Sequence, residues 1–343
     1  MKIIPKVSVI VPFYNNAITA NNSLKSLFSQ DLIDIEIIAV NDGSADDTRH
    51  VLDNIATNEA RLKVIHLTDN VGVHEARATG LRLSHASYIG FLDADDFAKP
   101  SMYRILLDAC VRHDADIAIC GIDRVSDNHQ VLYNKICFNS DKIIHDNIFD
   151  DFCCMAYGTG SLCNKLYSRG ILLKHASNSF RWRQDAGEDT LVNIGCFLDA
   201  KRISLVKDTL YEYVENSQSA TQSINNAKAF MRMFRAYALA LETYQHRGNS
   251  VIESITELYR RQLHYECYCI EELADLAEFH DLLAEAAKLI AELYPVGLAY
   301  LANCRKKQEQ EYVTKSLTKI KKEFGILPRL LLKAVQRRLS PSH

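Results

Sequence analysis

Four short apolar runs near the start of the chain each end in a cluster of polar side chains, and this repeat constrains the fold more than any other feature. The runs are rich in β-branched residues, which favour strands. They cover residues 7–11, 35–40, 62–67 and 88–92, and a fifth run covers 117–120. Segments of helical period separate them, at residues 20–30, 47–59, 73–84 and 101–112. Strands that alternate with helices predict an α/β fold with a mostly parallel, doubly wound, Rossmann-like sheet flanked by helices.

The polar clusters follow the strands directly. They are Pro12-Phe13-Tyr14-Asn15-Asn16, Asn41-Asp42-Gly43-Ser44, Asn70-Val71-Gly72 and Asp93-Ala94-Asp95-Asp96. In a doubly wound sheet, ligands bind beyond the carboxyl ends of the strands. Solubility alone does not explain polar residues at four successive strand ends, so we expect one ligand site at this edge of the sheet.

Three carboxylates, those of Asp93, Asp95 and Asp96, follow the fourth strand. Such like charges repel one another unless they share a cation. Oxygen ligands favour Mg²⁺ or Mn²⁺, held by one or two carboxylates together with substrate phosphates. The alternative is a solvated loop that caps the helix beginning near Ser101. The position at a strand end favours the metal site.

The C-terminal region has a different character. From about residue 225 a long helical period with few Gly or Pro replaces the alternation, after a junction rich in Ser, Asn and Gln at residues 216–226. The chain has 343 residues, of which 48% are hydrophobic and 24% charged, which is enough for two domains. We expect a helical C-terminal region over residues 221–343.

The end of the chain is strongly basic. From residue 305 onward eleven Lys and Arg stand against three acids, so this tail carries about +8 and the remainder about −11. Apolar residues recur among these charges over residues 315–339, which is typical of a segment that lies on an anionic membrane surface. A terminal helix packed on its own domain, or on a second copy in a homo-oligomer, is the alternative. The main body has no basic patch suited to nucleic acid.

Three further features bear on location. No charged-then-apolar leader precedes the first strand, no apolar run is long enough to span a bilayer, and the ten cysteines lack the paired spacing of a zinc site. We expect a protein of the reducing cytoplasm that contacts the inner face of the cytoplasmic membrane through its tail.

Six stretches together resemble the inverting glycosyltransferases of family 2 (GT2), which have the GT-A fold, and in particular the bacterial polysaccharide and lipopolysaccharide type. The stretches are residues 9–15, 36–46, 70–77, 90–96, 164–167 and 187–190. Their order and spacing carry the resemblance, which covers about the first 215 residues. It implies a GT-A catalytic domain over residues 1–220, with a nucleotide-sugar half at about 1–120 and an acceptor half at about 121–220.

The resemblance implies a nucleoside pocket. Pro12, Tyr14 and Asn15 would line it, with the tyrosine ring stacked on the base. Asp42, followed by Gly43, would accept a hydrogen bond from the base imide, which favours uracil. An ordinary half-buried aromatic is the alternative explanation of Tyr14.

The resemblance also implies residues for the diphosphate and the metal. Arg77 would face the phosphates, Asp93 and Ala94 would lie at the ribose, and Asp95 would bind Mn²⁺ or Mg²⁺. The alternative for Arg77 is a solvated helix face, because it lies within an amphipathic segment.

For the reaction, the resemblance assigns the general base to Asp189 and leaves Glu188 to contact the acceptor or to hold its neighbour. Inversion requires one carboxylate to take the proton of the acceptor hydroxyl while that oxygen attacks from the face opposite the diphosphate. Acids at a helix N-terminus also suit the helix dipole, and both explanations can hold at once.

On the acceptor side, the loop of residues 158–161 with Asn164 and Lys165 resembles an acceptor loop in which Lys165 touches phosphate or sugar. A turn before a strand is the alternative. Trp182, the single tryptophan, would stack on a sugar or serve packing alone.

The function implied is transfer of a sugar from a UDP-sugar donor to a saccharide or glycolipid acceptor, in bacterial surface-polysaccharide synthesis. A sugar nucleotidyltransferase is the alternative enzyme, but it needs a Gly-rich phosphate loop with a basic residue after the first strand. An NAD-linked dehydrogenase is disfavoured because no GxGxxG motif follows a strand. A nucleotide- or glycan-binding module without activity is the alternative outside catalysis.

Overall fold

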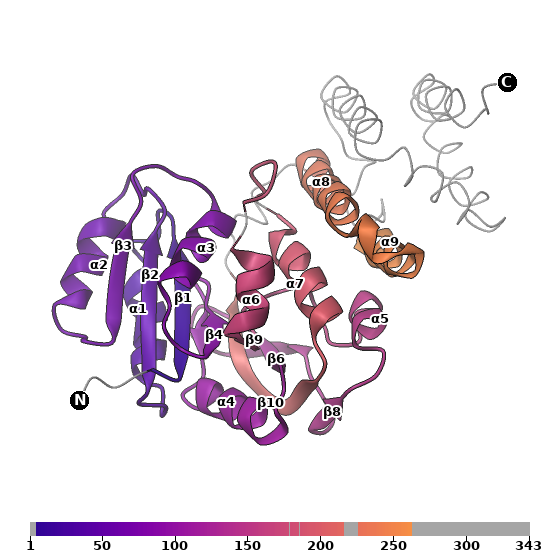
Figure 1. Cartoon of the computed structure of the whole chain (residues 1–343). Coiled ribbons are helices and arrows are strands. Elements are labelled where there is room, and N and C mark those ends of the chain that lie inside the picture. Colours follow the sequence, from indigo (N-terminus) through magenta and orange to yellow (C-terminus); the bar gives the residue numbers. More distant parts are fainter. Residues whose placement is uncertain (1–4, 178, 185, 216–225, 263–343) are drawn as a thin grey trace, which may run out of the picture. The chain divides into compact units, whose positions relative to one another are not determined.

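The structure is a computed structural model of the chain, and it describes residues 5–177, 179–184, 186–215 and 226–262. The chain divides into two compact units, Met1–Ser223 and Ile224–His343, which we describe separately (Figure 1). The predicted basic tail and most of the predicted junction lie outside the described residues. None of the described helices is long and apolar enough to cross a membrane.

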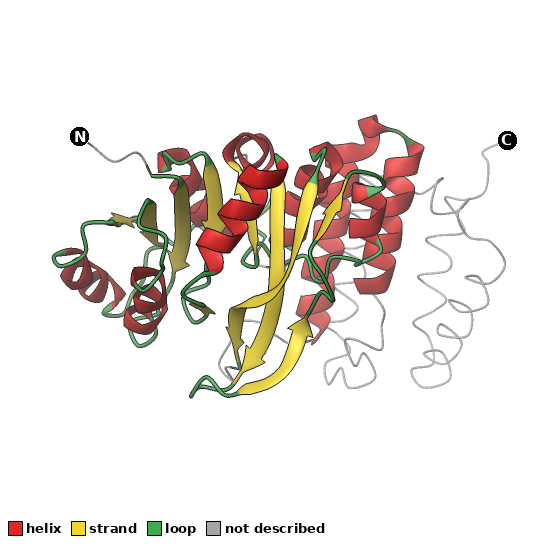
Figure 2. Cartoon of the chain, turned by 90° about the horizontal axis from the view of Figure 1, so that it is seen from below, coloured by secondary structure: helices red, strands yellow, loops and turns green. Residues whose placement is uncertain are grey.

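The first unit is built on one mixed sheet, in which the strands run side by side as Figure 2 shows. Its strands are β1 (Val7–Phe13), β2 (Ile35–Asn41), β3 (Leu62–His66), β4 (Tyr88–Phe91), β5 (Phe97–Ala98), β6 (Ile117–Val125), β7 (Val131–Ile136), β8 (Lys142–Ile144), β9 (Lys165–Ser168) and β10 (Ile203–Val214). Their order is β3-β2-β1-β4-β9-β6-β10-β5, with β7 paired to β6 and β8 paired to β10.

Most strands along this order point the same way. β3, β2, β1 and β4 pair in parallel, and so do β6 and β10. β9 lies between β4 and β6 and is antiparallel to both. The predicted mostly parallel α/β sheet is therefore confirmed. The antiparallel β9 was not predicted, because four residues are too few to show a period.

Seven helices accompany the sheet in the described part of this unit. They are α1 (Ala20–Phe28), α2 (Thr48–Ala56), α3 (Val73–Leu83), α4 (Met102–His113), α5 (Ile148–Cys153), α6 (Arg169–Ala176) and α7 (Glu188–Asp199). The predicted helices of the first hundred residues begin within about a residue of α1 to α4. Ser101 occupies the N-cap position of α4, but its side chain makes no capping hydrogen bond.

Helices cover both faces of the sheet. Gly80 of α3 packs against Ile10 of β1, and Tyr103 of α4 packs against Gly90 of β4. Gly90 is the register partner of Val9, whose side chain points away from that of Ile10 because side chains alternate along a strand. α3 and α4 therefore lie on opposite faces.

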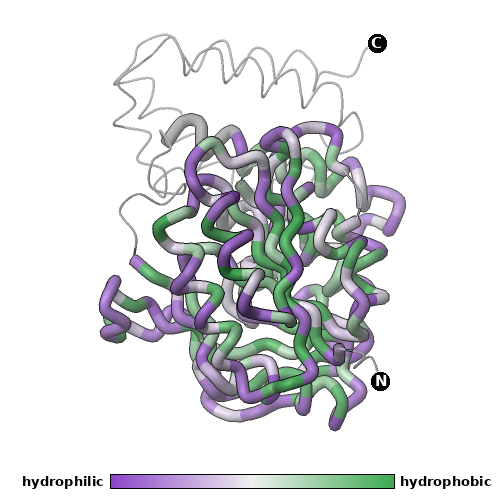
Figure 3. Tube along the Cα trace, turned by 90° about the vertical axis from the view of Figure 1, so that its left-hand side faces the viewer, coloured by the Kyte–Doolittle hydropathy of each residue, from purple (hydrophilic) through white to green (hydrophobic). Residues whose placement is uncertain are grey.

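The strands at the centre of the sheet are buried because helices cover both of its faces. All seven residues of β2 are buried, as are six of the seven in β1. Strands buried on both faces read as continuous apolar runs instead of alternating ones, which is the pattern seen in the sequence. Figure 3 shows the hydrophobic stretches along the interior of the trace and hydrophilic ones at the turns.

The described part of the second unit is helical, as predicted. It contains α8 (Asn226–Tyr244), a 3₁₀ turn η1 (Gln245–Arg247) and α9 (Asn249–Gln262). The Tyr237 hydroxyl lies 3.0 Å from Thr256 Oγ1, and the rings of Tyr237 and Tyr259 are 5.1 Å apart. These contacts pack α8 against α9 as an antiparallel helical pair joined by a short turn.

Candidate active site

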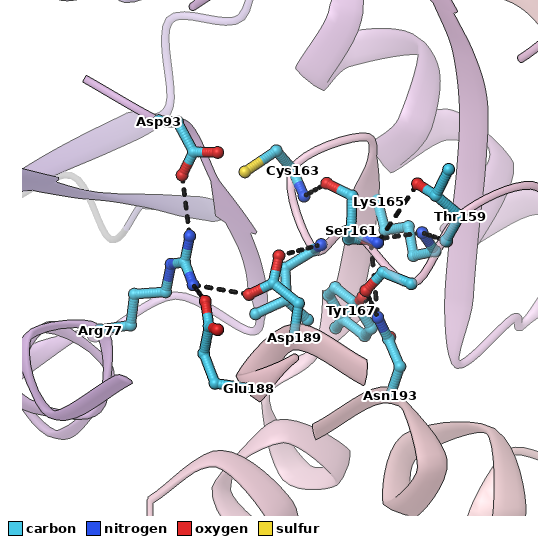
Figure 4. Close-up of polar contacts among 12 residues, drawn as sticks. Arg77, Asp93, Thr159, Ser161, Cys163, Lys165, Tyr167, Glu188, Asp189 and Asn193 are labelled. Carbon is cyan, nitrogen blue, oxygen red and sulfur yellow. Dashed lines mark hydrogen bonds and ion pairs between the residues drawn. The ribbon is translucent and has the colours of Figure 1, made fainter. Parts of the chain in front are cut away.

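A single guanidinium joins three carboxyl groups from two distant parts of the sequence. Arg77 Nη2 donates to Asp93 Oδ1 at 2.8 Å, while Nη1 donates to Asp189 Oδ1 at 2.6 Å and to Glu188 Oε1 at 3.0 Å (Figure 4). Charge-assisted hydrogen bonds of this kind are strong and directional. The structure thus brings together Arg77, Asp93, Glu188 and Asp189, four of the residues singled out in the sequence.

Local structure places each member of this cluster. Arg77 lies in the first half of α3, on the face that packs toward the protein, and is 6% exposed. Asp93 follows β4 at its carboxyl end. Glu188 and Asp189 form the first turn of α7, directly after Gly187, whose φ of 78° turns the chain into the helix. The solvated helix face considered for Arg77 is therefore wrong.

Glu188 has an unusual electrostatic environment. Its side chain is almost fully buried. Burial and the neighbouring charge of Asp189 raise the pKa of Glu188 to about 8, against the opposing effect of Arg77. At neutral pH this carboxyl group therefore holds a proton, and the charges around Arg77 are those of Asp93 and Asp189.

Asp42 lies at the end of β2 and holds the loop that leads into α3. Its Oδ1 accepts from the Val71 N–H at 2.8 Å, and its Oδ2 accepts from the Gly72 N–H at 2.9 Å. The adjacent Gly43 has φ +61°, and a Cβ there would lie 2.5 Å from the backbone carbon of Asp69. These two residues thus fix the close approach of the two loops at the sheet edge.

The predicted nucleoside pocket begins at the end of β1. Pro12 is partly exposed, and Tyr14 is 49% exposed, so its ring has a free face available for stacking. Asn15 adopts a left-handed φ of 54° and bonds the neighbouring loop, donating from its N–H to Ser44 Oγ and accepting at Oδ1 from the Ala45 N–H. The first and second polar clusters are therefore tied together.

The acidic triplet divides into two kinds of carboxylate. Asp96 is buried, and it accepts hydrogen bonds from the Tyr211 hydroxyl at 2.6 Å and from the Val214 N–H at 2.9 Å. Burial and the charges of Asp93 and Asp95 raise its pKa well above the ordinary value. Asp96 is thus a buried structural group that anchors β10, whereas Asp93 and Asp95 remain partly exposed beside buried Ala94.

The carboxylate oxygens at this edge of the sheet suit a hard divalent cation that takes its remaining ligands from the substrate. Within the described ranges, no three His, Cys, Asp or Glu side chains are arranged to hold a metal by themselves. Mg²⁺ and Mn²⁺ sites in phosphate-handling enzymes need only one or two carboxylates, the remaining ligands being phosphate and water. The partly exposed carboxylate of Asp95 fits that arrangement.

Lys165 lies inside the protein, whereas the sequence led us to expect it in contact with phosphate or sugar. It is fully buried, and its Nζ donates to the carbonyl oxygens of Ser161 and Thr159 and to Asn164 Oδ1, at 2.5, 3.4 and 2.8 Å. Asn164 is also buried, and its amide donates to the Cys120 carbonyl. An ammonium has three donors, and all are used within the protein. The expectation that Lys165 touches phosphate or sugar therefore conflicts with its position.

Trp182 is partly exposed on the segment that precedes α7, with the guanidinium of Arg181 5.4 Å from its ring centre. Nearby, Arg183 Nη1 donates to the Asn70 carbonyl at 3.0 Å. That bond ties the segment carrying Trp182 to the loop before α3. The ring is thus partly exposed on a segment that is bonded to the loop before α3.

Two site residues were missed in the sequence. Asn193 of α7 is fully buried, bonding the Gly160 carbonyl and the Tyr167 hydroxyl, each at 2.6 Å. A polar residue inside the otherwise apolar run of residues 191–197 was the available signal. Leu162 donates its N–H to Asp189 Oδ2 at 3.2 Å, and a backbone contact of this kind leaves no mark in the sequence.

Comparisons with known proteins agree with this geometry. Residues 8–175 match the family described as glycosyl transferase family 2. The chain is 30% identical over 248 residues to the uncharacterized glycosyltransferase EpsJ of Bacillus subtilis, covering 71% of each protein. It is 37% identical over 93 residues to the GalNAc(5)-diNAcBac-PP-undecaprenol beta-1,3-glucosyltransferase of Campylobacter jejuni, covering 27% of this chain and 30% of that protein.

Among solved structures, residues 1–349 of S. aureus TarS in complex with UDP-GlcNAc superimpose with a TM-score of 0.63 and 20% sequence identity. The match covers 83% of this chain and 81% of that one. At this identity the likeness establishes the GT-A fold. From the family match, the EpsJ relationship and the shared fold, we conclude that the chain belongs to the family 2 glycosyltransferases and is an enzyme of that class.

Proposed function

We propose that the enzyme transfers a sugar, with inversion, from a UDP-sugar to a saccharide or lipid-linked saccharide. The observation that carries this proposal is the bonding of Arg77 to Asp93 on one side and to Asp189 on the other. It joins a carboxylate at a strand end, where a nucleotide would bind, to a carboxylate at the start of α7 that can serve as a base.

Related proteins support the choice of donor and acceptor. TarS was solved in complex with UDP-GlcNAc and with UDP. The C. jejuni relative is named as a glucosyltransferase acting on an undecaprenol-linked saccharide. A role in bacterial surface-polysaccharide synthesis, with a hexosyl or N-acetylhexosaminyl group transferred, follows from the same resemblance.

Within the donor site, the exposed ring of Tyr14 would stack on the uracil and Pro12 would border it. Asp42 already accepts two backbone N–H bonds, and its remaining lone pairs would accept from the base imide. Asp93 would hold the ribose. Arg77 would turn part of its fork from the carboxylates to the diphosphate, for which its geometry is equally suited.

The transfer needs no covalent enzyme intermediate. Asp189 would take the proton from the acceptor hydroxyl while that oxygen forms a bond to the anomeric carbon. The bond from that carbon to the diphosphate oxygen breaks, and UDP leaves with the electron pair. A Mn²⁺ or Mg²⁺ ion at Asp95 would supply Lewis-acid stabilisation of the departing diphosphate. Glu188, which is protonated at neutral pH, would hold its neighbour or contact the acceptor.

The sequence alone motivates three more proposals. The tail would place the enzyme at the inner face of the cytoplasmic membrane, through its positive charge and apolar residues. The helical region over residues 221–343 would pair two copies of the chain. Residues 1–220 would form the catalytic domain, with Trp182 near the acceptor.

An assay of UDP release from UDP-sugars, with acceptor, tests the proposal. We expect turnover with Mn²⁺ that chelation abolishes, and a roughly 10²- to 10⁴-fold lower kcat in Asp189→Asn, which removes the base. The matched control is Asp199→Asn at the other end of α7, a carboxylate that pairs with Lys174 and His175. Undiminished turnover in Asp189→Asn would overturn the assignment of the base. Formation of UTP and sugar 1-phosphate from the UDP-sugar when pyrophosphate is added, with no release of UDP, would indicate a nucleotidyltransferase.

A further inference from the structure

The loop of residues 158–162, which precedes β9, lies directly on α7 beside Asp189 (Figure 4). A Cβ at Gly160 would overlap the side chain of Thr190, so the loop backbone touches the helix. The Leu162 N–H donates to Asp189 Oδ2 at 3.2 Å, and Asn193 Nδ2 donates to the Gly160 carbonyl at 2.6 Å. The helix therefore holds the loop at two points.

These two points lie on one side of α7. Asp189 and Asn193 are four residues apart, and such residues are neighbours on a helix surface. Asn193 is itself fixed, because its Oδ1 accepts from the buried Tyr167 hydroxyl at 2.6 Å. The side-chain amide of Asn193 therefore has a fixed position from which it bonds the loop.

Lys165 also holds this loop. Its Nζ bonds the carbonyls of Thr159 and Ser161 and the amide oxygen of Asn164. The carbonyls of Thr159 and Ser161 thus accept from Lys165, and the Gly160 carbonyl between them accepts from Asn193. The N–H of the next residue, Leu162, is left facing the carboxylate of Asp189.

This arrangement is a costly way to anchor a loop. Lys165 is fully buried, and all three of its hydrogen-bond partners are neutral oxygens, so the loss of hydration is offset only by these bonds and by the charge of Asp189, which does not bond it directly. An apolar residue of similar length would fill the same space at lower cost. What the ammonium adds is direction, because it aligns three oxygens around one point.

We propose that Lys165 and Asn193 are positioning residues that hold the 158–162 loop against α7, so that the Leu162 N–H fixes Asp189 Oδ2 and leaves Oδ1 to act. The proposal rests on the function proposed above, in which Asp189 is the base. In the structure Arg77 bonds Oδ1, so the carboxylate is held between a cation and a backbone donor. Oδ1 becomes available to the acceptor hydroxyl when Arg77 turns toward the diphosphate, as proposed above.

Because Lys165 holds the loop as a charged ammonium group, this anchoring should weaken at alkaline pH. Burial lowers the pKa of Lys165 to about 8, despite the favourable charge of Asp189. The other titratable groups that face it are the thiols of Cys120 on β6 and Cys163 before β9, and burial raises the pKa of both. Those thiols stay neutral near pH 8, so the loss of a proton there occurs on the lysine, which then has one donor fewer for the loop oxygens.

The test uses the full chain with Lys165→Met and, as a second variant, Asn193→Ala. For each we would measure kcat and the KM for the UDP-sugar from pH 6 to 10, binding of UDP by calorimetry, and amide exchange of the peptide containing Leu162. A misplaced base typically costs about 10²-fold, so we expect kcat to fall roughly 10- to 100-fold with KM and UDP affinity within about twofold of wild type.

Two readouts distinguish positioning from a merely structural role. In a Glu188→Gln background, which removes the other group that titrates near pH 8, the alkaline decline of kcat should disappear on Lys165→Met. The Leu162 amide should exchange faster in both Lys165→Met and Asn193→Ala. Lys63→Met is the matched control, because this lysine pairs with Glu36 on β2 at a half-exposed position. If Lys165→Met does not fold, Asn193→Ala carries the kinetic and exchange tests.

Unchanged kcat and unchanged exchange at Leu162 would overturn the proposal. So would a loss of UDP affinity that matches the loss of kcat, since that result would mean Lys165 acts on the donor. If the wild-type chain transfers no sugar, the proposed function fails, whereas the exchange measurement still reports whether the two residues hold the loop.

Discussion

Arg77 Nη1 lies 2.6 Å from Asp189 Oδ1, although the two residues are 112 positions apart in the chain. Because the same guanidinium also bonds Asp93, it ties the end of β4 to the start of α7 through α3. A buried cation surrounded by carboxylates is stabilising only while all partners are present. The donor side and the proposed base are therefore coupled by one side chain.

Arg77→Met should leave the partly buried carboxylates of Asp93 and Asp189 without their cation. We expect a loss of about 3–5 kcal/mol in the free energy of unfolding at pH 8. Urea denaturation of the variant and of wild type checks this. The control is Arg104→Met, whose half-exposed pair with Asp31 is screened by water and should contribute far less; equal losses in the two variants would contradict the prediction.

Glu188 should make the protein less stable as the pH rises from about 5 to 8. Its pKa is raised to about 8 in the folded protein, whereas an unfolded Glu titrates near pH 4.3, so in this window only the folded state holds the proton. The slope is at most about 1.4 kcal/mol per pH unit. Glu188→Gln cannot ionise and should flatten it.

Thermal unfolding from pH 5 to 8 measures this slope. Glu59→Gln is the matched control, because the Arg61 side chain lowers the pKa of Glu59. Both folded and unfolded Glu59 are then ionised throughout the window, so its replacement should leave the slope as in wild type. A Glu188→Gln variant with the wild-type slope would show that Glu188 is ionised in the folded protein.

Variants of Asp95 should impair metal binding, whereas variants of Asp96 should impair the stability of the fold. Asp95→Asn should weaken Mn²⁺ activation by roughly 10- to 100-fold or more while the free energy of unfolding stays near that of wild type. Asp96→Asn should lower that free energy by about 1–3 kcal/mol, because an amide oxygen cannot replace both carboxyl oxygens that bond Tyr211 and Val214. Titration with Mn²⁺ and chemical denaturation of both variants test the assignment, which a wild-type Mn²⁺ response in Asp95→Asn would refute.

Replacement by alanine should destabilise the protein at Gly43 and stabilise it at Gly170. At Gly43 the left-handed backbone alone costs an L-residue about 1–2 kcal/mol, and the new Cβ would also press on the backbone of Asp69. At Gly170, within α6, a Cβ meets nothing within 4 Å, so alanine should stabilise by about 0.5–1 kcal/mol. Denaturation midpoints compare the two, and a tolerated Gly43→Ala would mean that the loop contact can relax.

The sheet was predicted well where strands are long and apolar. The run at residues 35–40 became β2, Ile35–Asn41, because a buried strand of β-branched residues needs little help from distant contacts. β10 was not recognised as a strand. It runs from Ile203 to Val214 with Lys207 and Asp208 in its middle, where its pairing to β6 is irregular, so its sequence shows no clear period.

By itself the sequence determined the alternation of strands and helices, the helical character of residues 226–262 and the gathering of polar residues at one edge of the sheet. These depend on local sterics and on hydrophobic periodicity, which neighbouring residues carry. Only the tertiary structure decided that Arg77 bonds Asp189 and Glu188, that Asp96 anchors β10, and that Lys165 is buried under the 158–162 loop. The partners of a polar side chain are set by which elements pack together, and packing is a property of the whole fold.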